Sequence, residues 1–178
     1  MRKVLILAFF SVFSTLLPGS TLRQLSLDDM IKQSTLIVRG KVQPSTAAFH
    51  GSIIFSHYQL QITETLKGKA SGTIDIVVPG GASKGLQQTY AGAPSLSSTQ
   101  DYVLFLWTSK SGLTQVIGLS QGLFAVVNNS SNQPFVIRAA STERMLDASG
   151  QPVTDSDIQM SLSALRNRIQ GVLSGGSK

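Results

Sequence analysis

The six residues Tyr102–Trp107, "YVLFLW", decide the expected fold. Every position in this run is apolar or aromatic, so both faces of the strand that it predicts should be buried. Other runs before and after it alternate between apolar and polar residues and end near glycine or proline. Antiparallel strands joined mostly by hairpins have this pattern. The segment is therefore predicted to be the most buried strand of a mainly β protein.

Six further strands are predicted around this segment. The second of them is long and should bend, as the strands of a small barrel must. The last two should form a hairpin across the turn-rich stretch "NNSSNQ". Between the strands, "GLSQG", Gly118–Gly122, is interpreted as a bend within a strand. The six predicted strands are residues 35–42, 53–66, 73–79, 113–118, 122–127 and 134–138.

A short helix is predicted near the start of the mature chain and a longer one at its end. Ser26 is the expected N-cap of the first, with Asp29 three residues later. The second should begin at Asp155 or Ser156 and end at Gly171. Its apolar stripe is Ile158, Leu162, Leu165 and Ile169.

Strands in succession without alternating helices favour a small antiparallel barrel over an α/β fold. The expected fold is an OB-like barrel with a short N-terminal helix and a C-terminal helix packed on it. One such domain is predicted over residues 21–172, followed by a flexible tail at 173–178. The long irregular connection within it is residues 80–101.

The first residues predict a secretory signal peptide, residues 1–20. Arg2 and Lys3 precede an apolar run, Val4–Leu17, that breaks at Pro18 before small polar residues. The run is shorter than the roughly 20 apolar residues needed to cross a bilayer. Because the cleavage site has no Ala-x-Ala pattern, a retained membrane anchor is the alternative. We expect cleavage between about residues 19 and 21 and a secreted or periplasmic protein.

The amino-acid composition excludes several kinds of site and several classes of binding partner. The chain has no cysteine, which excludes disulfides, thiolate metal ligands and a lipid-attachment site. Removing the signal peptide lowers the formal charge from +6 to +4, and no basic run is interleaved with aromatic residues. We therefore expect no nucleic acid and no membrane as partner after signal removal, and no cofactor. A protein or an extracellular polymer is the expected partner.

Few residues qualify as chemical sites. The two histidines, His50 and His57, have no acidic residue at a recognisable metal-ligand spacing, and Glu64 and Asp75 are the nearest. His57, Asp75 and a serine would make a hydrolytic triad, but the sequence has no Gly-x-Ser-x-Gly elbow. These residues are interpreted as surface polar groups, with no catalytic and no metal residue assigned.

The stretch "GGASKG" begins the long connection and raises the question of anion binding. It lacks the Gly-Lys-Ser/Thr ending and the following helix of a phosphate loop. A solvated connection is one interpretation, and a loop that borders a binding surface is the other. In the second, the binding residues are Gly80, Gly81, Lys84 and Tyr90.

The order of these segments resembles the netrin-like module of the tissue inhibitors of metalloproteinases. The matching features are "VRGKV", a long second strand ending "LKG", and "YVLFL" before a glycine turn. The chain also resembles, more closely, cysteine-free secreted bacterial proteins of unknown function. These carry "LKG", "PGG", "GAP", "YVLFL" and "GLSQG" in this order. The first resemblance implies an OB-fold barrel, and the second implies no activity.

The inhibitors of that family chelate a protease zinc through an N-terminal cysteine, which this chain lacks. Inhibition is therefore not carried over to any residue here. The expected function is a secreted binding module that is not an enzyme. The alternatives are a module that resembles a protease inhibitor and a hydrolase with an unrecognised site.

Overall fold

The computed structural model describes residues 21–175, and two antiparallel strands form its centre, β2 (Leu36–Val42) and β8 (Asp101–Thr108). In β8 the residues from Tyr102 to Leu106 are all buried, as predicted. Trp107 follows them and is 37% exposed. The most apolar run of the sequence is thus the middle of the sheet, and its last aromatic residue reaches the surface.

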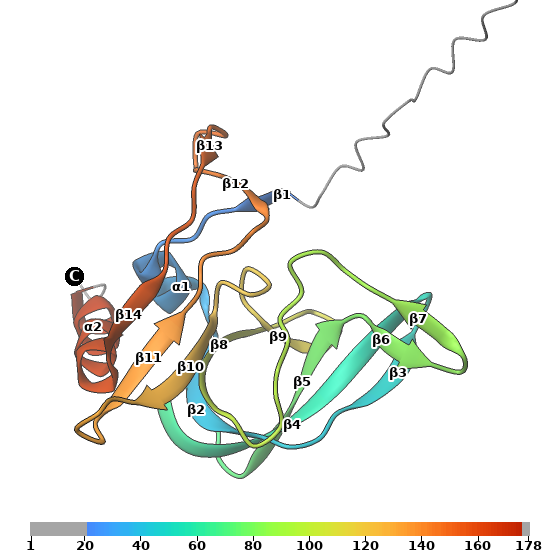
Figure 1. Cartoon of the computed structure of the whole chain (residues 1–178), viewed down its shortest axis with the longest axis horizontal. Helices are drawn as coiled ribbons and strands as arrows, with labels where there is room; N and C mark the ends of the chain where they lie inside the picture. Colours follow the sequence, from blue (N-terminus) through green and yellow to red (C-terminus); the bar gives the residue numbers. More distant parts are fainter. Residues whose placement is uncertain (1–20, 176–178) are drawn as a thin grey trace, which may run out of the picture.

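The main sheet has the order β14-β11-β10-β8-β2-β4-β3, with β5 also paired to β4 and β9 to β8 (Figure 1). All these pairs are antiparallel. Each predicted strand has a counterpart in it, and the predicted last hairpin is β10 with β11. The further strands of the sheet are β3 (Thr46–His50), β4 (Ile53–Lys67), β5 (Thr73–Pro79), β9 (Thr114–Val116), β10 (Leu123–Asn128), β11 (Pro134–Arg138) and β14 (Ile158–Ser161).

The remaining described strands form two small sheets. In one, β1 (Thr21–Arg23) runs parallel to β12 (Arg144–Leu146), which pairs with β13 (Pro152–Val153). In the other, β6 (Gly81–Ser83) and β7 (Leu86–Gln88) form a hairpin. That hairpin lies inside the connection that was predicted to be irregular, so this prediction was wrong for residues 81–88.

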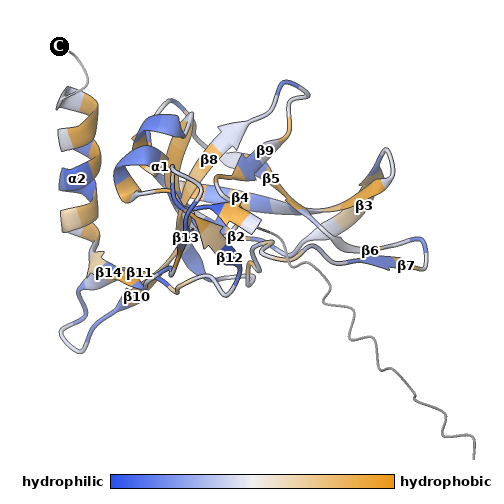
Figure 2. Cartoon of the chain, turned by 90° about the horizontal axis from the view of Figure 1, so that it is seen from above, coloured by the Kyte–Doolittle hydropathy of each residue, from blue (hydrophilic) through white to orange (hydrophobic). Residues whose placement is uncertain are grey.

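The central strands separate two hydrophobic cores. Alternate side chains of β8 point to opposite faces, so Val103 and Phe105 enter one core and Leu104 and Leu106 the other. The first, here called the helical core, is closed by both helices, which lie at the end of the molecule away from β3, β6 and β7 (Figure 2). The second, the strand core, is formed mainly by β2, β4, β5, β8 and β9. Burial on both faces explains why β8 has no polar alternation.

The N-terminal helix α1 (Leu27–Gln33) begins as predicted. The Ser26 hydroxyl accepts a hydrogen bond from the Asp29 N–H at 3.1 Å, and the Asp29 carboxylate accepts from the Ser26 N–H at 3.3 Å. This is a capping box, which satisfies two backbone donors at once. At the other end, Lys67 Nζ donates to the carbonyl oxygens of Ile31 and Ser34, both at 2.6 Å. A cation there complements the negative end of the helix.

The C-terminal helix α2 (Leu162–Gly175) differs from the prediction at both ends. Residues 158–161 are strand β14, because they pair with β11. The Ser161 hydroxyl accepts a hydrogen bond from the Ala164 N–H at 3.1 Å and so caps the helix in place of Asp155 or Ser156. Gly171 does not end the helix, which includes residues 173–175 of the expected tail. The predicted stripe is buried at Leu162, Leu165 and Ile169.

The mainly β, antiparallel character of the expected fold is confirmed, and its helix packs on the sheet. A closed barrel is not found. Strands β5 and β9 lie side by side, but no backbone ladder joins them within residues 21–175. Neither described helix is long and apolar enough to span a membrane. The predicted signal peptide falls outside the described residues.

Candidate functional site

A pocket of about 430 Å³ opens at the end of the helical core, where Trp107 leaves the buried part of β8. Its walls come from the N-terminal segment, from β8 and from the connection between β9 and β10. Pockets that hold small molecules are of this size and mostly apolar, with a few polar groups. The apolar lining residues are Leu22, Leu25, Trp107, Ile117 and Leu119, and the polar ones are Arg23, Gln33 and Gln121.

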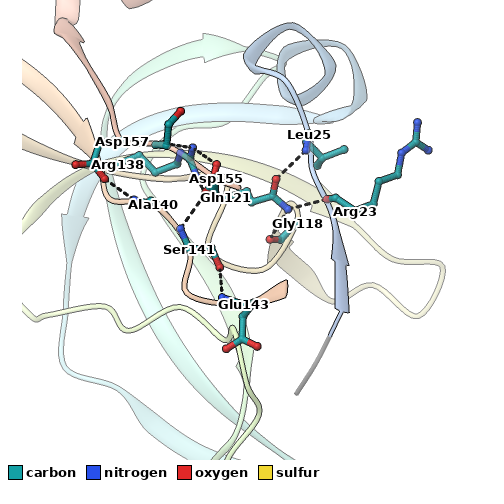
Figure 3. A network of polar contacts seen from close by, with 11 residues as sticks. Arg23, Leu25, Gly118, Gln121, Arg138, Ala140, Ser141, Glu143, Asp155 and Asp157 are labelled. Atoms are coloured by element: carbon teal, nitrogen blue, oxygen red, sulfur yellow. Dashed lines mark hydrogen bonds and ion pairs between the residues drawn. The ribbon is translucent and has the colours of Figure 1, made fainter. Parts of the chain in front are cut away.

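Gln121 ties two walls of this pocket together. Its side chain is buried, with the residue only 1% exposed. The amide oxygen accepts a hydrogen bond from the Leu25 N–H at 2.8 Å, and the amide nitrogen donates to the Arg23 carbonyl at 2.9 Å and the Gly118 carbonyl at 3.3 Å (Figure 3). A buried amide with every contact satisfied is a rigid link. The pocket is therefore built into the fold.

The connection that carries Gln121 is strained. Leu119 has φ of 59°, in the left-handed region that costs a residue other than glycine about 1–3 kcal/mol. Gly118, with φ of 60°, has no room for a side chain, because a Cβ there would lie 2.8 Å from the Gln121 amide nitrogen. The segment was predicted to be a bend within a strand. It is instead a turn between β9 and β10, and it places Leu119 in the pocket wall.

Arg23 brings a positive charge to the pocket. Its side chain is exposed and has neither an ion pair nor a side-chain hydrogen bond within the described part of the chain. Hydrogen bonding from Ser26 lowers the pKa of Asp29, and the charges of Lys32 and Arg23 act in the same direction. The field of Arg23 thus reaches the first turn of α1. The pocket combines an apolar wall with one cation.

The predicted binding residues lie elsewhere and are only partly brought together. Gly80, Gly81 and Tyr90 border a smaller pocket of about 250 Å³ at the base of the β6–β7 hairpin. Lys84 is not among its lining residues and sits at the hairpin tip, with φ of 50°. A two-residue hairpin turn favours such a conformation at Lys84 and Gly85. The unusual backbone at Lys84 therefore has a structural explanation.

The glycines at the hairpin base allow close packing. A Cβ on Gly81 would lie 2.6 Å from the Ser56 hydroxyl oxygen. That hydroxyl donates to the Gly80 carbonyl at 2.9 Å. The Gln88 side chain accepts from the Ile54 N–H at 2.7 Å and so fastens the hairpin to β4. These contacts hold the hairpin in place.

Two of the three groups of the hypothetical triad do meet. His57 Nδ1 lies 2.8 Å from one Asp75 oxygen, and Gln59 donates to the other oxygen at 2.9 Å. The pair lies on the exposed face of β4 and β5. No serine hydroxyl contacts His57 among the described residues. His50 packs edge-on against Phe55, with ring centroids 6.3 Å apart. Residues 21–175 contain no group of three metal-ligating side chains.

A buried ion pair lies near Gln121 and the connection between β9 and β10 (Figure 3). Arg138 donates to both Asp155 oxygens, at 2.6 and 2.9 Å, and the two side chains are 6% and 3% exposed. Asp155 also accepts from the Ser141 N–H at 2.8 Å. Burial alone would raise the pKa of Asp155, but the hydrogen bonds from Arg138, Ser141 and Ser156, with the charge of Arg138, outweigh it and lower the pKa to about 2. This pair holds the 138–141 segment against residues 155–157, which precede β14.

Comparison with known proteins gives no relative. The chain matches no protein-family model, no curated protein sequence and no solved structure.

Proposed function

We propose that the mature chain is an exported binding module without enzymatic activity and that it holds the apolar part of a small ligand in the Trp107 pocket. The observation that carries the proposal is a pocket of ligand size whose wall includes a strained residue, Leu119. Strain is retained where the surrounding structure enforces it, often at ligand sites. The lining side chains offer apolar contact and hydrogen bonding and only one charged group.

We further propose that the scaffold is an OB-like barrel. The strands β5-β4-β2-β8-β9 follow one another through hydrogen-bonded ladders, and β9 lies beside β5. A partly open five-stranded barrel would have this order of neighbouring strands, and it is the fold that the resemblance to netrin-like modules implies. A fold alone carries no function, so the binding proposal depends on the pocket.

Export is expected to remove the first residues of the chain. The basic start and short apolar run predict cleavage near residues 19–21, just before β1. Intact-mass measurement on protein recovered outside the cytoplasm should give a chain that begins there. A mass that includes residues 1–17 would contradict the prediction and favour a retained anchor.

Binding in the pocket is expected to change the fluorescence of Trp107, the only tryptophan of the chain. We propose octan-1-ol as a neutral aliphatic probe, titrated while the emission is recorded. Burial of about five methylene groups at about 0.8 kcal/mol each gives about 4 kcal/mol. This corresponds to a Kd of about 1 mM. A saturable change at or below this concentration is the expected result, and no change up to the solubility limit would contradict it.

Two variants locate the binding. Leu119→Gly removes part of the apolar wall and relieves the backbone strain, so the affinity should fall at least about fivefold while the stability changes by no more than about 1 kcal/mol. The double variant Lys84→Ala with Tyr90→Ala removes the polar and aromatic contacts of the predicted loop and should leave the affinity unchanged. If instead the double variant binds more weakly and Leu119→Gly binds as the wild type does, the binding site lies at the β6–β7 hairpin.

A further inference from the structure

We infer that the ligand of the Trp107 pocket carries a carboxylate beside its apolar group and that Arg23 selects this carboxylate. The inference rests on the proposed function, because it assigns the ligand class of the same pocket. It follows from two observations. Arg23, unlike most of the other described arginines, has no carboxylate partner in the described part of the chain, and the described pocket wall contains no acidic group.

Four arginines in residues 21–175 have a carboxylate within ion-pair distance. They are Arg39 with Asp101, Arg138 with Asp155, Arg166 with Glu64 and Arg168 with Asp28. Arg23 and Arg144 have no such partner in the described part of the chain. Of these two, only Arg23 lines the pocket. The fold uses most of its guanidinium groups to bind its own carboxylates, and at this pocket it leaves one available.

The backbone of Arg23 is fixed although its side chain is not. Its carbonyl accepts the hydrogen bond from the buried Gln121 amide, and Leu25, two residues later, is held by the same side chain. The guanidinium therefore starts from a fixed point at the pocket wall and extends away from the polar network (Figure 3). A planar guanidinium binds a carboxylate through two parallel hydrogen bonds.

The charged residues near the pocket are Arg23, Lys32, Asp29 and Glu143, the last of which approaches Gly92 together with the lining residues Leu22 and Leu119. Lys32 and Asp29 are the charged residues of α1 on this side, and both Asp29 side-chain hydrogen bonds go to Ser26. No carboxylate is among the residues that line the pocket. With one guanidinium and a wall of aliphatic and aromatic side chains, the complementary ligand is an aliphatic or aromatic monocarboxylate. Its tail would lie against Trp107 and Leu119.

The test compares three probes of equal chain length, octanoate, octan-1-ol and octylammonium, by Trp107 fluorescence at pH 7 and low salt. Octanoate is expected to bind at least about tenfold more tightly than octan-1-ol, a difference of about 1.4 kcal/mol. Octylammonium should bind more weakly than either. Arg23→Gln should remove the advantage of octanoate over octan-1-ol.

Arg144→Gln is the matched control. Arg144 lies on β12, opposite Thr21 of β1, and does not line the pocket. The variant therefore removes the same charge from the neighbouring strand and leaves the pocket wall unchanged. This variant should keep the preference for octanoate, and thermal unfolding should show that both variants are folded. Equal affinity of the wild type for octanoate and octan-1-ol would overturn the carboxylate inference and leave the proposed function standing. Failure of all three probes to bind would overturn both. Octyl phosphate is added as a fourth probe, and its binding more tightly than octanoate would overturn the assignment of a carboxylate.

Discussion

Replacing Phe105 with alanine is expected to lower the free energy of unfolding by about 3–5 kcal/mol. Phe105 is completely buried in the helical core, and its ring lies 5.3 Å from the ring of Phe124 at 45°. Removing it deletes the aromatic pair and leaves a cavity under both helices, because the surrounding strands are fixed by their ladders. Urea denaturation of the two proteins, followed by circular dichroism, measures the loss.

The control is Val127→Ala, a similar deletion on the adjacent strand β10. Val127 is 38% exposed, so its loss should cost less than about 1 kcal/mol. A loss of less than about 1 kcal/mol for Phe105→Ala as well would mean that β8 does not separate two cores. This result would contradict the description of the fold given above.

Replacing Asp155 with alanine is expected to cost about 3–5 kcal/mol, because it leaves the buried Arg138 guanidinium without its partner. The matched control is Asp28→Ala, which breaks the bidentate pair with Arg168, whose side chain is 58% exposed. Exposed pairs contribute about 0–1 kcal/mol. Comparable losses for the two variants would show that the burial of the Arg138 pair has no energetic effect.

The same pair should make the stability depend on acid. The pKa of Asp155 is about 2 in the folded protein and has an ordinary value of 3.8, so its contribution is complete above pH 3.8 and is lost as the pH falls toward 2. This lowering of the Asp155 pKa corresponds to about 2 kcal/mol of stability. Urea midpoints measured from pH 5 to pH 2 should fall less steeply in Asp155→Asn than in the wild type. Parallel curves would contradict the assignment.

The sequence predicted the parts of the fold that depend on local patterns. Alternation and the run at residues 102–107 gave the central strands, and Ser26 with Asp29 gave the start of α1. The start of α2 was missed because Ile158 and Leu162 also fit a helical spacing. Pairing of residues 158–161 with the open edge of β11 decides the conformation there. Tertiary hydrogen bonding outweighs local propensity in such a segment.

The candidate site was less predictable. Gly80, Gly81 and Tyr90 do share a small pocket, but the hairpin turn holds Lys84 away from it. The Trp107 pocket joins segments that are far apart, since Gln121 bonds to a carbonyl 98 residues earlier. No local motif describes such an arrangement. Two sequence features do belong to the pocket, Trp107 at the end of the buried strand and "GLSQG", which was interpreted only as a bend in a strand.

The position of β8 between the two cores has a consequence for the order of folding. Its partner β2 lies far away in the chain, as the contact between Thr35 and Leu106 spans 71 residues, whereas β9 and β10 follow it directly. While only the first hundred residues have been synthesised, β2, β4 and β5 can pair, but the shared wall of both cores is missing. Chains dominated by such long-range contacts fold slowly. A nascent chain of this kind can complete neither core until β8 has been synthesised.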